Sequence, residues 1–92
     1  MKTKPVLTLY VTTDCAACRR TRSVLRDCGE INSLVEVEVV VLDEAGAVRH
    51  PKVIGVPTIV FQDTVVGLGT PDCCLLAEQL RECFELSPDT VN

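Results

Sequence analysis

The sequence has 92 residues, a length that predicts one domain with a small core. Hydrophobic residues make up 47% of the chain and aromatic residues only 3%, so the core is expected to be aliphatic. The net charge of −4 argues against a nucleic-acid-binding protein, whose surface would be basic. The apolar stretch near the N-terminus is about six residues long, shorter than a secretory signal or a membrane span requires, and we therefore expect a cytoplasmic protein that is not bound to a membrane.

The first half of the chain predicts a strand, a helix and a second strand. Residues 5–12 are β-branched and apolar, which is typical of a strand buried on both faces. Residues 16–28 have apolar side chains at helical spacing, with arginines on the opposite side, and Gly29 is suited to end this helix. In residues 34–42, valines alternate with two glutamates, as in a strand with one wetter face. The two strands of such a unit are expected to be parallel.

The second half predicts a hairpin and a final helix. Residues 43–55 include a glycine and a proline that interrupt any long helix, so at most one or two short turns are expected there. Residues 57–62 and 65–68 predict the two strands of the hairpin, with Asp63 and Thr64 in its turn.

The final helix is predicted over residues 71–86, with Thr70 as its N-cap and Pro71 at its first helical position. Leu75 lies off the apolar stripe of this helix and suggests a wider packing surface. The stripe itself consists of Cys73, Leu76, Leu80, Cys83 and Phe84. These elements together predict one α/β domain over residues 1–92, with a mixed sheet and helices on both of its faces.

Two cysteines, Cys15 and Cys18, stand where the first strand gives way to the first helix. The unpaired N–H groups and the dipole of a helix N-terminus favour an anion, and a thiolate is such an anion. The pKa of Cys15 is therefore expected to be low, helped by nearby arginines. Cys18 points inward on the apolar stripe, so Cys15 is predicted to attack a substrate disulfide and Cys18 to resolve the mixed disulfide.

A second candidate site is the dipeptide Val56–Pro57, which opens the predicted strand over residues 57–62. A proline at a strand start is ordinary punctuation, because it cannot donate to the sheet. A cis bond at this position would instead turn the backbone of Val56 outward, where its N–H and C=O could pair with an extended substrate.

Of the remaining four cysteines, three are predicted to be structural and one exposed. Cys28, Cys73 and Cys83 fall on inner helix stripes and are interpreted as reduced core fillers. Cys74 is predicted to be an exposed thiol, open to glutathionylation or to covalent dimer formation. A disulfide between the adjacent Cys73 and Cys74 would be strained and is not expected.

The CxxC of Cys15 to Cys18 and the turn Val56-Pro57-Thr58 resemble the thioredoxin superfamily in their order and separation. The resemblance covers roughly residues 5–86 and implies that family's fold, β-α-β-[short α]-β-β-α with a mixed four-stranded sheet flanked by helices. In that family the proline is cis and lies against the CxxC. Within the superfamily, the chain is more similar to glutaredoxins and to small glutaredoxin-like thioredoxins than to other members. Tyr10 stands where they often carry tyrosine, and residues 67–72 resemble the glycine-rich turn before their last helix.

Three positions depart from the family patterns. Thr12 replaces a lysine that helps glutaredoxins to hold glutathione, and Leu9 replaces the buried aspartate of typical thioredoxins. Two alanines separate the cysteines, in place of the Pro-Tyr of glutaredoxins or the Gly-Pro of thioredoxins. The use of glutathione and the redox potential therefore do not follow from the resemblance.

The resemblance implies a thiol–disulfide oxidoreductase that reduces protein disulfides or glutathione mixed disulfides. It implies no bound cofactor, with glutathione or a separate reductase as the source of electrons, and we expect a monomer. Two alternatives stay open. A CxxC also suits a copper or zinc carrier, because thiolates are soft ligands. A non-catalytic thioredoxin-like interaction module would keep the same cysteines without using them.

Overall fold

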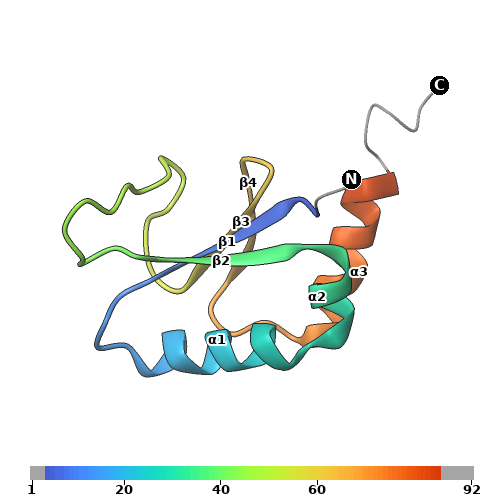
Figure 1. Ribbon diagram of the computed structural model, residues 1–92, viewed down its shortest axis with the longest axis horizontal. Coiled ribbons are helices and arrows are strands. Elements are labelled where there is room, and N and C mark those ends of the chain that lie inside the picture. The colour runs from blue at the N-terminus through green and yellow to red at the C-terminus, as the bar shows by residue number, and fades with distance from the viewer. Residues whose placement is uncertain (1–3, 86–92) are drawn as a thin grey trace.

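The computed structural model describes residues 4–85, with side chains as far as Cys83. Its elements are β1 (Val6–Val11), α1 (Ala16–Asp27), α2 (Gly29–Leu34), β2 (Glu36–Val41), β3 (Thr58–Phe61), β4 (Thr64–Leu68) and α3 (Cys73–Glu85). The strands form one sheet in the order β2-β1-β3-β4, in which β1 and β2 are parallel and the other two pairings are antiparallel (Figure 1). The predicted α/β class and mixed four-stranded sheet are confirmed. No helix within the described residues is long and apolar enough to cross a membrane.

The main core lies between the sheet and all three helices. Alternate residues of β1 (Leu7, Leu9 and Val11) project into it and are fully or almost fully buried. Side chains from α1, α2 and α3 pack against the same face, as Figure 1 shows for the helices below and beside the sheet. Apart from Phe61 and the sulfur-containing Cys18 and Cys28, the main core cluster is almost entirely aliphatic, as the composition predicts.

Among the described residues no helix lies on the other face of the sheet, so the prediction of helices on both faces was wrong. A smaller cluster of Tyr10, Val53 and Val60 covers part of this face, and Val53 comes from the long segment between β2 and β3. That segment forms only turns and irregular loop, as its glycine and proline predicted. The short helix that the thioredoxin resemblance implied between these two strands is therefore absent, and that part of the predicted fold was wrong. Because the loop covers only part of the face, Val6 remains 47% exposed, and β1 is not buried on both faces along its whole length.

The short helix α2 was missed; it begins at Gly29, directly after Cys28, which ends α1. The side chain of Asn32 explains the sharp junction between the two helices. Its Nδ2 donates to the backbone oxygens of Leu25, Arg26 and Cys28, at 2.8, 3.1 and 2.8 Å. The carbonyls of Leu25 and Arg26 belong to the last turn of α1, which leaves them without helical partners, so Asn32 caps α1 from the next helix. The Cys28 carbonyl also accepts the backbone N–H of Asn32, at 3.1 Å, as the first helical bond of α2.

The hairpin turn lies one residue earlier than predicted. Gln62 and Asp63 form it with positive φ angles of 52° and 64°, and Thr64 already pairs with Phe61 in the sheet. Two residues in the left-handed region are typical of a tight hairpin turn whose twist matches that of the strands.

The final helix also begins later than predicted. The carboxylate of Asp72 accepts the backbone N–H groups of Cys74 and Leu75, at 2.9 and 3.1 Å, so Asp72 caps α3 in place of Thr70. Thr70 instead accepts a hydrogen bond from the buried hydroxyl of Thr21 on α1. Leu75 is 66% exposed and does not widen the packing surface. The predicted inner position of Phe84 and the helix end at residue 86 lie outside the described side chains and residues.

Candidate functional site

Cys15 occupies the N-cap position of α1, where its sulfur replaces the usual capping oxygen. The backbone N–H of Cys18 donates to Cys15 Sγ, with 3.1 Å between nitrogen and sulfur. The carbonyl of Cys15 in turn accepts the N–H of Arg19, which starts the helical ladder. Cys15 is half-buried and Cys18 only 2% exposed, and both are free thiols. The predicted pair of an accessible and a covered thiol is therefore present.

The two thiols have pKa values shifted in opposite directions. The pKa of Cys15 is lowered, first because the Cys18 thiol donates to its sulfur, and further by backbone N–H groups of the first turn and the charge of Arg19. The pKa of Cys18 is raised, chiefly because burial disfavours a thiolate and because its proton is engaged by Cys15. Cys15 is thus the thiol that ionises first, and Cys18 holds its proton.

The loop that carries Cys15 is anchored by residues that sequence reasoning missed. The backbone N–H of Thr13 donates to both carboxylate oxygens of Asp43, at 3.1 and 3.2 Å. This hydrogen bond lowers the pKa of Asp43. Thr12 contributes hydrogen bonds to the sulfur of Cys18 that partly offset the rise in its pKa. The signal for Asp43 was its place just after β2, because parallel strands end at the same edge of the sheet.

The peptide bond between Val56 and Pro57 is cis, and Pro57 is buried. The antiparallel pairing of Tyr10 with Thr58, continued by one residue, places Pro57 opposite Val11, where β1 runs into the CxxC loop. Val56 and Cys15 both pack against the main core cluster. Among the described residues, none is bonded to the N–H or C=O of Val56, whereas the carbonyl of Pro57 accepts from Gly69 N–H at 3.0 Å.

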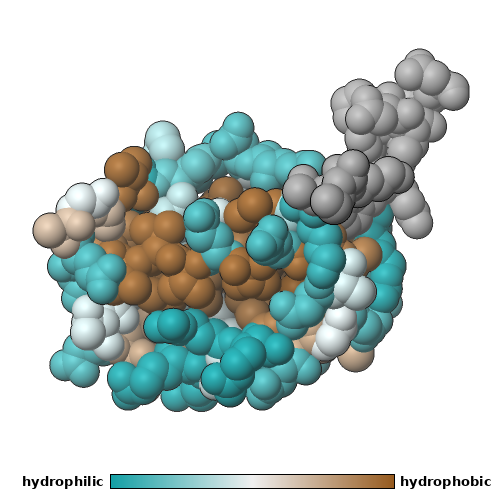
Figure 2. All heavy atoms as spheres, viewed as in Figure 1, coloured by the Kyte–Doolittle hydropathy of each residue, from teal (hydrophilic) through white to brown (hydrophobic). Residues whose placement is uncertain are grey.

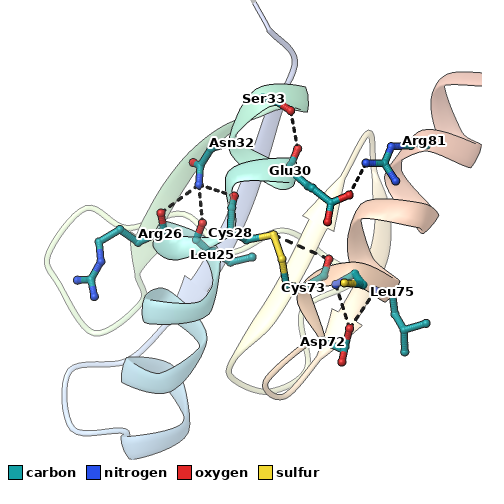
Figure 3. The surroundings of a disulfide bond; sticks show 11 residues. Leu25, Arg26, Cys28, Glu30, Asn32, Ser33, Asp72, Cys73, Leu75 and Arg81 are labelled. Carbon is teal, nitrogen blue, oxygen red and sulfur yellow. Dashed lines mark hydrogen bonds and ion pairs between the residues drawn. A yellow bond between two sulfur atoms is a disulfide. The ribbon is translucent and has the colours of Figure 1, made fainter.

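The prediction that Cys28 and Cys73 are reduced core fillers was wrong. The two cysteines form a disulfide across 45 residues of sequence. Figure 3 shows that this bond joins the end of α1 to the start of α3. A nearby ion pair between Arg81 and Glu30, 2.6 Å apart, ties α3 to α2 on the same side. The prediction failed because the packing of α3 beside the α1–α2 junction, which no local pattern reveals, brings the two cysteines together.

Cys74 is an exposed free thiol, as predicted, and Cys83 is free and half-buried. Since Cys73 is bonded to Cys28, there is no disulfide between Cys73 and Cys74. Within the described part of the chain, no group of three or more His, Cys, Asp or Glu side chains is arranged to hold a metal ion.

Comparison of the chain with protein-family models, with curated proteins and with solved structures found no match.

Proposed function

We propose that this protein is a thioredoxin-like thiol–disulfide oxidoreductase that reduces protein disulfides or glutathione mixed disulfides. The observation that carries the proposal is the unequal pair at the start of α1. Cys15 is accessible, accepts a backbone N–H and has a lowered pKa, whereas Cys18 is buried beneath it with a raised pKa. An attacking thiol needs a thiolate and access, and a resolving thiol needs only to stay protonated nearby until the first step is complete.

The reaction follows from this pair. The Cys15 thiolate attacks one sulfur of the substrate disulfide, the substrate S–S bond breaks, and the other substrate sulfur leaves as a thiolate that takes up a proton. Cys18 then loses its proton and attacks Cys15 Sγ, which breaks the mixed disulfide and releases the second substrate thiol. The substrate has gained two electrons and the protein holds a Cys15–Cys18 disulfide. Two glutathione molecules or the dithiol of a reductase restore the thiols.

The cis turn at Val56 and Pro57 is proposed as the ledge for the substrate backbone. The N–H and C=O of Val56 have no partner among the described residues, so an extended segment next to Cys15 can accept and donate there. The Cys28–Cys73 disulfide has no part in this reaction, because it lies at the opposite end of α1. The proposed action as a reductase fits the expected cytoplasmic location, where thiols are kept reduced. The Cys28–Cys73 disulfide is of a kind more typical of an oxidising compartment.

The test is to trap the mixed disulfide. A Cys18→Ser variant cannot resolve the intermediate, so it should accumulate covalent adducts of Cys15 with a disulfide-containing protein such as insulin or with oxidised glutathione. A Cys15→Ser variant is the matched control and should form no adduct at residue 18. If the Cys18→Ser variant forms no adduct with either substrate, the oxidoreductase proposal is wrong.

A further inference from the structure

A groove runs along the outer side of β2, between this strand and α1. One part of it is a hollow of about 310 Å³ with Leu9, Leu25, Val37 and Val39 as its apolar lining and Arg22 and Arg26 at its rim. A second hollow of about 200 Å³ shares Arg22 and continues past Arg19 and Glu44 to Cys18. We call the two hollows together the β2 groove. Figure 2 shows its hydrophobic band in brown along β2, bordered by the hydrophilic side chains of α1.

The strand beside the groove has a free hydrogen-bonding edge. In the part of the chain that the structure describes, β2 is the outermost strand and pairs only with β1. The N–H groups of Glu36 and Leu42 donate to carbonyls of the β1 side, at 2.9 and 2.8 Å. Because successive backbone groups of a strand point to opposite sides, those of the odd-numbered residues between them point outward. The carbonyl of Val41 is used by Glu44 N–H, so Val37 and Val39 present the free donors and acceptors.

The α1 side of the β2 groove carries positive charge from Arg22 and Arg26. Arg22 has no ion pair among the described residues, and Arg26 has only an exposed contact with its neighbour Asp27, 3.2 Å long. The two arginines are four residues apart on α1, which is a rise of about 6 Å. Alternate residues of an extended strand are separated by about 6.7 Å. Two acidic side chains at alternate positions of a strand on β2 would therefore meet Arg22 and Arg26.

We propose that the β2 groove binds an extended acidic peptide segment, which adds to the sheet as a fifth strand beside β2. Its backbone pairs with Val37 and Val39, and its carboxylates at alternate positions contact Arg22 and Arg26. The methylene groups of the same acidic side chains cover the half-buried valines. The residues between them lie near Glu36 and Glu38 on the other face, which favours polar or basic side chains there.

A second copy of this chain is a poorer occupant of the same edge. Two β2 strands paired about a two-fold axis would set the arginines of both α1 helices along the same face of the joined sheet, where like charges repel. An acidic partner removes this repulsion. The proposal does not depend on the redox role of the cysteines, and none of them takes part in its test.

The experiment is a titration of the isotopically labelled protein with a blocked heptapeptide in which glutamate alternates with threonine. The amide signals of Val37 and Val39 are expected to shift on binding, and binding should weaken as salt is added. Arg22→Ala should weaken binding by about two- to fivefold. The matched control is Arg20→Ala, because Arg20 is exposed on α1 and does not line the groove.

Three altered peptides test the geometry. A peptide with lysine in place of each glutamate should not bind. In two further peptides, alternate backbone nitrogens are methylated, at the odd positions in one and at the even positions in the other. The one whose methylated nitrogens face β2 should not bind, because it has lost the N–H groups that pair with the strand. Equal binding by Arg22→Ala and Arg20→Ala, binding of the lysine peptide, or full binding by both methylated peptides would overturn the proposal. So would self-association of the protein through β2 that Arg22→Ala leaves unchanged.

Discussion

At the start of α1 the sulfur of Cys15 is free and accepts a backbone N–H, whereas just past the end of α1 the sulfur of Cys28 is bonded to Cys73. The two ends of a helix offer sulfur different surroundings. The N-terminus presents unpaired N–H groups that stabilise a thiolate, and the C-terminus presents carbonyl oxygens that repel one. One helix can thus support a thiol of lowered pKa at its N-cap and a neutral disulfide just after its last residue.

The largest expected difference between the two ends of α1 is in the rate of disulfide reduction. In the Cys15→Ser variant, the rate of disulfide reduction should fall to the uncatalysed rate, because a serine hydroxyl does not replace a thiolate as the attacking group. The double variant Cys28→Ser/Cys73→Ser should retain activity per folded molecule within about twofold, because its substitutions are distant from the reacting pair. Insulin reduction and the reduction of a glutathione mixed disulfide provide the measurement. A double variant as inactive as Cys15→Ser would show that the two ends of α1 are not separate in function.

The second expected effect is on stability, and it belongs to the other end of α1. A disulfide across 45 residues restricts the unfolded chain, and its loss should lower the free energy of unfolding by about 4 kcal/mol. The free energy of unfolding is measured by urea unfolding with and without a reductant. The reductant should lower it by this amount for the natural sequence and should leave it unchanged for the double variant. Cys83→Ser is the control for removing a free cysteine. Equal unfolding midpoints for the oxidised and fully reduced protein, with the thiols verified by alkylation, would contradict the structural role.

A smaller effect is expected at Asp43, which holds the loop before Cys15 through Thr13 N–H. Its pKa is lower in the folded than in the unfolded protein, so its stabilising contribution is present above the unfolded pKa and is lost as pH falls through the folded pKa. The melting temperature of the natural sequence should therefore fall more steeply than that of Asp43→Asn below about pH 4. Glu44→Gln, an exposed neighbour, should retain the steep fall. Parallel curves for Asp43→Asn and the natural sequence would count against the anchor.

Local patterns predicted much of the fold and part of the site. The apolar run of β1, the helical spacing of α1 and the alternation in β2 each depend on residues close in sequence, and these elements form where expected. Helix α2 was not predicted because its six residues are too few to show a clear helical periodicity of apolar side chains. It forms where Asn32 caps α1.

What sequence could not supply was tertiary proximity. The Cys28–Cys73 bond, the Thr13–Asp43 anchor and the β2 groove each join elements whose distance in space is set only by packing. The unequal burial of Cys15 and Cys18 was predictable, because the helical spacing places Cys18 on the inner stripe of α1.

The central claim is that Cys15 ionises before Cys18, and the direct measurement is the pH dependence of alkylation at each cysteine, followed by peptide mass spectrometry. The account predicts that Cys15 reacts with a midpoint below the ordinary thiol value of 9.0, that Cys18 reacts with one above it, and that Arg19→Ala moves the Cys15 midpoint upward. Equal midpoints for the two thiols, or a lower one for Cys18, would contradict it.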